Sequence, residues 1–391
     1  MRQKSCTKAF CAIRDFATGP GFFFLAGLAY LLASSASAMD LFLQSMNPRV
    51  SVTPLAFAVF LAGLIAYMAG LKTAKIALRL GRIPLVAGFV AGTVAAFFIL
   101  EMNLFAAVLF NAAALIICLI LLNARFRHEY AFGAGFCVFW MNLAVFGIPL
   151  LQPQMHVQLF TIINALFIIG FVLMVYSLIR LFPRYRLLWP VVLISTVFST
   201  YRVYMGIVFI SWVLLELKQS DRMERKRVLW LVLLAVFLAA VFFYVGYLSV
   251  KSQHADWILD PVRTMEYRLG LTMGVFTDIV GISFPFGHTF GGSLTMEATE
   301  FTCRVLYGCT SRITSTAFGV AMLDFGIAGV LLAGWWVGVV LGNVRRKDYP
   351  LYCFLFAVAL SAIDVGINIF AILLFIYLGW TGLVVRWKRK K

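Results

Sequence analysis

Long apolar runs, broken at short intervals by polar or charged clusters, cover almost the whole chain of 391 residues. An α-helix needs about 20 apolar residues to cross a bilayer, and many runs approach that length. Shorter runs leave re-entrant or broken helices as an alternative. We interpret twelve runs as spans, at residues 20–38, 53–71, 83–100, 104–122, 131–150, 157–181, 187–200, 203–217, 227–249, 314–343, 349–363 and 365–386. The predicted fold class is all-α, a polytopic transmembrane helical bundle of about 12 spans with one long, partly helical external loop.

The composition agrees with this interpretation and removes other classes. Hydrophobic residues make up 63% of the chain and charged residues only 13%, against roughly 45–50% and 25% in soluble domains. A net charge of +17 would suggest nucleic acid in a soluble protein. Here the basic residues form short clusters between apolar runs, so we predict no nucleic-acid partner. No low-complexity linker divides the chain, and residues 1–391 are predicted to form a single integral membrane domain.

The basic clusters also predict the topology. Of the 33 lysines and arginines, 26 fall in one set of alternate loops. The positive-inside rule therefore places both termini in the cytoplasm. The first run ends in Ala36-Ser37-Ala38, as a signal peptide does, but we favour a retained helix because the run is long for a signal. The other loops hold only Arg49, Arg202, Lys251, Arg263, Arg268, Arg304 and Arg312.

One external segment, residues 251–313, differs in composition from the rest of the chain. It mixes acidic and basic residues with two apolar pieces, Leu269–Phe276 and Ile279–Phe286, that are too short to span a bilayer. We expect amphipathic or re-entrant helices at the membrane interface there. Loops of this length are usually functional, and we predict that this one forms the roof of an active site. Cys303 and Cys309 could pair if the segment faces an oxidising compartment.

External arginines are informative because the topology does not require them. Arg202 follows Tyr201 between two short apolar runs. A charge at the centre of a membrane costs about 2.5–3.5 kcal/mol, so a helix break at residues 200–203 would place Arg202 near the outer surface. It is either a snorkelling turn residue or an anion-binding arginine, whose planar fork suits phosphate.

Arg268 offers a similar choice. It stands at the start of an apolar stretch, where it could face a bound diphosphate or pair with a nearby acid such as Asp260 or Glu266. On a helix, Arg263 and Arg268 would point about 140° apart, so helix geometry alone does not make them one clamp. We interpret the other arginines of the segment, Arg304 and Arg312, as solvated loop charges.

Three residues could act as acids or bases. His288 lies in a glycine-rich turn and is either a general base for a sugar hydroxyl or a hydrogen-bonded loop histidine. Asp324 lies well inside an apolar run, where it could orient an arginine, act as a base or mark a helix break. Asp278, in the external segment, could take the same roles as Asp324. The spacing of the four histidines supports no metal site, and we expect no metal or cofactor.

The order of these elements from Ser199 to Gly342 resembles the oligosaccharide repeat-unit polymerase family, of the O-antigen polymerase type. The matching elements are Tyr201-Arg202, a basic loop at Lys218–Arg227, a span at Val228–Tyr247, the pattern Arg268-x-x-x-Thr272 followed by Ile279-Val280, Pro285-x-Gly287, and Thr314–Gly319 with Asp324–Gly329. The N-terminal half resembles the family only as a row of membrane helices.

The resemblance implies a metal-independent membrane glycosyltransferase of the GT-C type. Such enzymes act at the outer face of the cytoplasmic membrane, moving a growing glycan from a polyprenyl-diphosphate carrier onto a new lipid-linked repeat unit. Membrane lipid surrounds the site, and flippases and chain-length regulators are expected neighbours. The resemblance assigns the diphosphate to Arg202 and Arg268, with Arg263 and Tyr201 beside them, and leaves the base to His288, Asp278 or Asp324.

Two other functions fit the same topology. A transporter or flippase of lipid-linked oligosaccharides would suit twelve spans, although we see no paired interrupted helices in two matching halves. An O-antigen ligase-like glycosyltransferase would share the topology and differ in its acceptor. A non-catalytic scaffold would not need basic residues gathered in one external segment.

Overall fold

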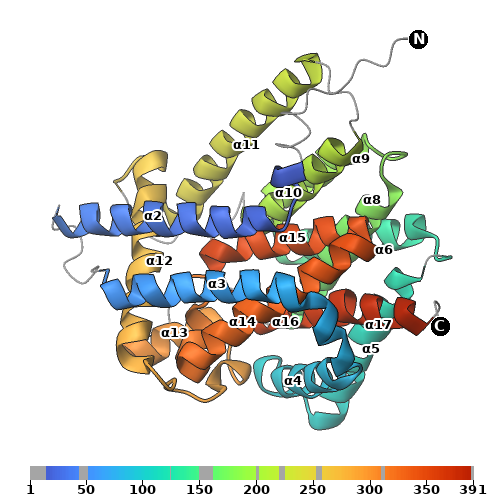
Figure 1. Cartoon of the computed structure of the whole chain (residues 1–391). Helices are drawn as coiled ribbons and strands as arrows, with labels where there is room; N and C mark the ends of the chain where they lie inside the picture. The colour runs from blue at the N-terminus through green and yellow to red at the C-terminus, as the bar shows by residue number, and fades with distance from the viewer. Residues whose placement is uncertain are drawn as a thin grey trace.

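The computed structural model describes residues 15–43, 52–123, 125–148, 162–199, 202–219, 225–251, 258–309 and 313–388. Every regular element within these ranges is a helix (Figure 1). The first half contains α2 (Gly21–Leu43), α3 (Pro54–Ala77), η1 (Leu78–Leu80), α4 (Ile83–Ile99), α5 (Leu104–Leu122), α6 (His128–Phe146), α8 (Ile162–Leu181) and α9 (Leu188–Phe198). The second half contains α10 (Arg202–Gln219), α11 (Arg225–Lys251), α12 (Pro261–Ser283), η2 (Gly292–Leu294), α13 (Ala298–Tyr307), α14 (Gly319–Lys347), α15 (Tyr349–Val365), α16 (Ile369–Leu374), the π-helix η3 (Phe375–Trp380) and α17 (Thr381–Lys388).

The all-α prediction is confirmed, because a helix corresponds to each of the twelve apolar runs. The last run is a continuous rod formed by α16, η3 and α17. Within the described ranges, five helices are long and apolar enough to cross a membrane: Gly21–Met39, Pro54–Leu80, Leu104–Leu122, His128–Phe146 and Gly319–Lys347. Shorter apolar helices complete the bundle. The protein is therefore a helical, polytopic membrane protein.

Close packing of α3 against α14 forms the centre of the bundle. Glycines make the contact: a Cβ atom on Gly334 would lie 2.2 Å from the carbonyl oxygen of Gly63, and one on Gly338 would lie 2.1 Å from that of Tyr67. Membrane helices associate through such small residues because lipid supplies little hydrophobic drive between them. The two backbones thus touch directly, which fixes the position of α14.

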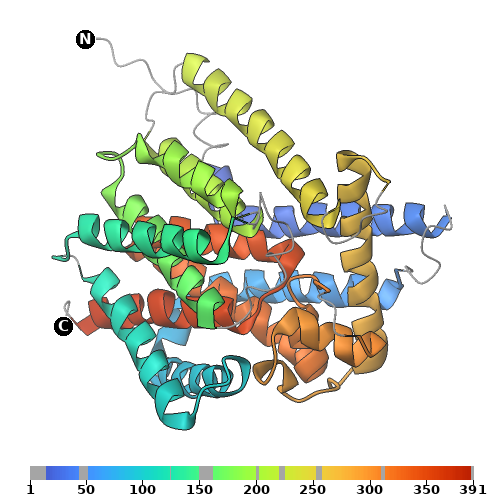
Figure 2. The same cartoon turned by 180° about the vertical axis from the view of Figure 1, so that it is seen from behind.

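Helix α12 departs from the direction of its neighbours. It lies across α2, α3 and α14 near one end of the bundle, whereas α17 ends at the other (Figures 1 and 2). Asp260 caps it by accepting hydrogen bonds from the amides of Val262 and Arg263 at 2.8 and 3.0 Å. The apolar piece Leu269–Phe276 and most of the piece Ile279–Phe286 belong to this one 23-residue helix, and its place at the membrane interface stays a prediction. We refer to this region as the α12 end.

The turn that follows Ser283 at the end of α12 packs against a break in α14. Gly326 interrupts α14 with φ +60°, a backbone conformation that favours glycine. A Cβ atom there would lie 2.0 Å from the carbonyl oxygen of Pro285, which accepts a hydrogen bond from Ile327 N at 3.0 Å. Cys303 and Cys309 form a disulfide at the end of α13, with Cα atoms 5.4 Å apart. The backbone contact between Pro285 and Ile327 attaches the segment to α14, and the disulfide closes a short loop within it.

Candidate functional site

Two arginines from distant parts of the sequence meet at the α12 end. Arg202 is the first residue of α10, one position earlier than expected, and α9 ends before it at Phe198. Arg268 lies on α12, two turns after its start. Both side chains are half-buried, and the charge of Arg268 acts on the guanidinium of Arg202. The crosswise orientation of α12 is what brings the pair together.

Packing holds Arg202 in a defined position. Its Nη1 lies 3.1 Å from the Sδ atom of Met265, and its guanidinium lies 5.4 Å from the centre of the Phe242 ring. A Cβ atom on Gly246 of α11 would come within 3.2 Å of Cδ and Nη1 of Arg202. The absence of a side chain at Gly246 therefore leaves the space that the arginine occupies.

A carboxylate and a phenol complete the cluster. The Tyr30 hydroxyl on α2 donates a hydrogen bond to Asp364 Oδ1 at 3.1 Å, near the end of α15. The charge of Asp364 attracts both arginines, and Tyr30 also lies near Thr272 and Arg268. Burial lowers the pKa of Arg268, and the nearby Asp364 carboxylate opposes this shift. We call Arg202, Arg268, Asp364 and Tyr30 the arginine cluster.

The arginine cluster has more positive charge than its one carboxylate can balance. Among the described residues, no acid lies within 4.0 Å of either guanidinium, and the acceptor for Arg202 is the weakly accepting sulfur of Met265. The amino-terminal end of α10 adds a partial positive charge of its own beside Arg202. Two half-buried guanidiniums with free N–H donors suit a dianionic group, since arginine binds phosphate oxygens in pairs.

The remaining arginines proposed from the sequence lie elsewhere or outside the described ranges. Arg263 is exposed and forms an ion pair with Glu266 at 3.0 Å. Arg304 pairs with Glu300 at 3.8 Å on α13. Tyr201 and Arg312 lie outside the described residues.

Asp324 does not join the arginines in this structure. It is buried at the start of α14, where its carboxylate accepts hydrogen bonds from Thr289 Oγ1 at 2.6 Å and from Ser293 N at 3.3 Å. The Ser293 hydroxyl donates a third. The helix break at Gly326 follows two residues later. In this arrangement Asp324 holds residues 289–293 against the broken helix.

The two other proposed acid–base residues lie near the same turn. His288 has an exposed side chain, and its backbone amide donates to Leu323 O at 2.8 Å. Asp278 accepts a hydrogen bond from the Tyr307 hydroxyl at 2.5 Å, which links α12 to α13. Within the described ranges, no group of three or more His, Cys, Asp or Glu side chains is arranged to hold a metal ion.

Comparison with known proteins shows what kind of chain carries this cluster. The O-antigen polymerase family model matches residues 44–378, which is most of the sequence. The chain belongs to the O-antigen polymerase family. It is also 31% identical over 140 residues to the uncharacterized protein MJ0420 of Methanocaldococcus jannaschii, which covers 36% of each chain. The sequence thus spans about a third of the length of that curated relative. No solved structure matches it.

Sequence reasoning missed two residues of the cluster in this O-antigen polymerase family protein. Asp364 falls between the last two predicted spans, and Tyr30 lies within the first. A signal for Asp364 was present, because a carboxylate between two apolar runs has a strong need for a partner. The sequence gives no comparable signal for Tyr30, since a tyrosine in an apolar run usually packs against neighbouring helices.

Proposed function

We propose that this protein polymerises lipid-linked oligosaccharide repeat units at the outer face of the cytoplasmic membrane. It would transfer a growing glycan from a polyprenyl-diphosphate carrier to a new lipid-linked repeat unit. Family membership supports the reaction class. The observation that carries the assignment is the convergence of Arg202 and Arg268, whose N–H groups have no carboxylate partner within 4.0 Å among the described residues.

The chemistry follows from the charge that develops on the leaving group. An acceptor hydroxyl oxygen attacks the anomeric carbon of the growing glycan, and the bond between that carbon and the diphosphate oxygen breaks. The electron pair stays on the diphosphate, which becomes more negative. Arg202 and Arg268 stabilise this charge by preorganised hydrogen bonds, a type of assistance that contributes strongly to catalysis in a site of low dielectric. Because these cations supply the positive charge, we propose that the reaction needs no metal.

Asp364 and Tyr30 act in this proposal as positioning residues. The carboxylate lies near both arginines without forming an ion pair within 4.0 Å, so it reduces their mutual repulsion and leaves their donors available to the diphosphate. Tyr30 fixes the carboxylate with its hydrogen bond at 3.1 Å. The two arginines are thus held in position before the substrate binds.

The acceptor hydroxyl must also lose a proton. We favour His288 for this step among the three candidates, since its side chain is exposed and histidine is the side chain that most often serves as a general base. Asp324 is engaged in three hydrogen bonds and Asp278 in one, so each has a structural task already. His288 would receive the proton from the acceptor hydroxyl as the new glycosidic bond forms.

Two observations support the outer face as the location. Lysine and arginine concentrate in the alternate loops away from the α12 end. The α12 end carries the Cys303–Cys309 disulfide, and disulfides persist in oxidising compartments. Residues 251–313 would then form the roof of the site, with both termini in the cytoplasm. A flippase that delivers repeat units and a chain-length regulator would be natural partners.

The glycan profile of cells that lack this protein tests the proposal. We expect the ladder of polymerised glycan to disappear on a gel while single repeat units remain attached to their final acceptor. Loss of all surface glycan would instead support a ligase or a flippase. An unchanged profile would reject a role in glycan assembly.

A further inference from the structure

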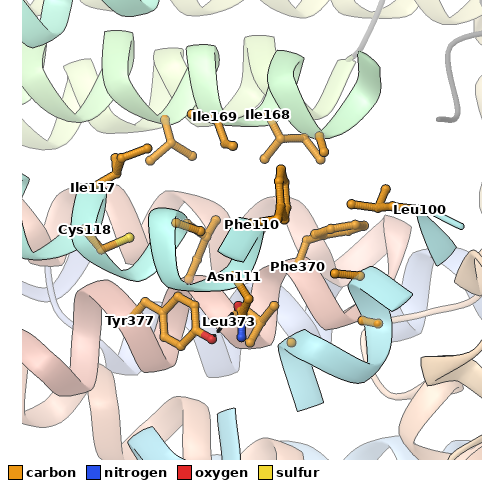
Figure 3. Close-up of a pocket in the computed structure, with 17 residues that line it drawn as sticks. Leu100, Phe110, Asn111, Ile117, Cys118, Ile168, Ile169, Phe370, Leu373 and Tyr377 are labelled. Carbon is orange, nitrogen blue, oxygen red and sulfur yellow. Dashed lines mark hydrogen bonds between the residues drawn. The ribbon is translucent and has the colours of Figure 1, made fainter. Parts of the chain in front are cut away.

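A second feature of the bundle lies outside the arginine cluster. A cavity of ≈ 100 Å³ opens between α4, α5, α8, α16 and η3. Its wall combines small residues such as Ala114 and Ala165 with larger apolar ones such as Phe110, Ile169 and Phe370 (Figure 3). Helices α4, α5 and α8 and the rod of α16 and η3 all contribute to it, so it is a space left between packed elements rather than a surface depression on one helix.

The polar atoms in this wall already have partners. Asn111 Nδ2 donates to Phe89 O at 2.8 Å and to Thr93 Oγ1 at 3.1 Å. Asn111 Oδ1 accepts from the Tyr377 hydroxyl at 2.7 Å, the contact drawn in Figure 3. The amide and the hydroxyl of this wall are therefore engaged already, and the remaining polar side chain, the Cys118 thiol, is only a weak donor. Apolar cavities of about 150 Å³ stay dry and take up small hydrocarbons, so an apolar occupant is favoured over water.

The cavity opens toward hydrocarbon. Several lining side chains are only half-buried, among them Phe110, Ile117 and Phe370. The adjacent outward faces of α4 and α5 are apolar and exposed, for example at Phe98, Leu109 and Ile116. In a membrane protein such faces contact lipid chains, so a chain can enter the cavity from the side without crossing polar surface.

A short stretch of chain connects this cavity with the arginine cluster. Asp364 lies at the end of α15, and Phe370, which lines the cavity, follows six residues later on α16. Six residues span at most about 22 Å even when fully extended. One elongated lipid can therefore reach both places, with its charged head at the arginines and its tail in the cavity.

We infer that this cavity binds the hydrocarbon tail of the lipid carrier whose diphosphate occupies the arginine cluster. The inference rests on the proposed function, and it adds the place where the tail is held. The apolar wall formed by α5 and α16 then contributes to carrier binding separately from the guanidiniums. An acyl chain of an ordinary bilayer lipid is the competing occupant.

Photo-crosslinking of the full-length protein in lipid vesicles tests this site. One probe is a polyprenyl diphosphate with a diazirine in its isoprenoid chain, and the other is a phosphatidylglycerol with a diazirine in one acyl chain. We expect the first probe to label the α5 and α16 peptides that face the cavity. We expect Ala114→Phe, which fills the space, to remove most of this label. Ala114→Leu is a milder version for use if the larger ring prevents folding.

Ala113→Phe is the matched control, because Ala113 neighbours Ala114 on α5 but is exposed and does not line the cavity. The inference is overturned if the acyl probe alone labels the wall, if neither probe labels it, or if labelling persists in folded Ala114→Phe. The glycan ladder of the same variants separates the two proposals. Wild-type protein that makes polymer without cavity labelling defeats only the tail site, whereas labelling without any polymer defeats the proposed function.

Discussion

Two parts of this protein bury arginine in opposite ways. At the end of α8, Arg180 donates to the Tyr176 hydroxyl at 2.9 and 2.6 Å and forms an ion pair with Asp348. At the α12 end, Arg202 and Arg268 lie together with one carboxylate nearby and no ion pair within 4.0 Å among the described residues. The first arginine is fully partnered and the second pair is not.

The difference separates a structural arginine from one arranged for a ligand. Asp348 also accepts from the Leu351 amide at 3.2 Å, so the Arg180 contact ties α8 to the start of α15. A fold gains stability from such an arrangement only when every charge is satisfied. The arginine cluster violates that rule, and proteins tolerate such violations mainly where function requires them.

Removing either arginine of the cluster should have the largest effect on activity. We expect Arg202→Ala and Arg268→Ala each to lower the polymerisation rate by about 10²–10³-fold, the usual loss for one preorganised donor to a developing anion. Arg→Lys should rescue poorly because the two-pronged fork is lost. Ladder length and initial rate in isolated membranes are the measurements. Arg304→Ala is the control, since Arg304 pairs with Glu300 on α13.

If both alanine variants were normally active at normal expression, the proposed mechanism would be rejected. A loss of membrane insertion instead of activity would show that these arginines stabilise the fold, as Arg180 does.

The partnered arginine should show the reverse pattern. We expect Arg180→Ala to lower the free energy of unfolding by about 3 kcal/mol, since the Asp348 carboxylate, whose side chain is 5% exposed, would lose the cation that forms an ion pair with it. Arg268→Met should leave the Tm unchanged or raise it, because it relieves repulsion within the cluster. Thermal unfolding in detergent measures both. Equal destabilisation by the two variants would remove the distinction between the two regions.

The sequence predicted much of this comparison but not all of it. Apolar runs located the helices because burial in lipid demands long uninterrupted apolar stretches. Arg202 and Arg268 could be selected from the sequence because the topology does not require a positive charge on the outer side, so their presence indicates a functional role. The crosswise path of α12 could not be predicted, since the direction of a helix depends on its contacts with elements distant in the sequence, here α2, α3 and α14. Asp364 and Tyr30 were missed for a related reason: their partnership depends on where α2 and α15 meet.

Asp364 should matter less than the arginines it accompanies. We expect Asp364→Asn to lower the rate about tenfold, because the amide keeps the shape but loses the charge that offsets Arg202 and Arg268. Tyr30→Phe removes only the hydrogen bond at 3.1 Å and should lower the rate about threefold. The ratio of kcat to KM for a lipid-linked acceptor measures both. A larger loss in Tyr30→Phe than in Asp364→Asn would contradict this order.

A still smaller effect should come from crowding Arg202. Gly246→Ala places a methyl group within about 3.2 Å of the guanidinium and 2.9 Å of Met265 Sδ, so both flexible side chains must shift slightly. We expect a few-fold rise in KM with little change in stability. Gly281→Ala on α12 is the control, because a Cβ atom there meets nothing within 4 Å. Identical kinetics for the two variants would show that the position of Arg202 is not critical.

Metal removal should have no effect at all. The two guanidiniums supply the positive charge that a divalent cation provides in other diphosphate-cleaving sites. Treatment of purified protein with EDTA should therefore leave the rate unchanged, and added Mg²⁺ should not rescue Arg268→Ala. Inhibition by EDTA that Mg²⁺ reverses would contradict the metal-free mechanism. Rescue of the Arg268→Ala variant by Mg²⁺ would show that any cation can occupy the place of the guanidinium, and that the charge of the arginine rather than its fork is what the leaving diphosphate requires.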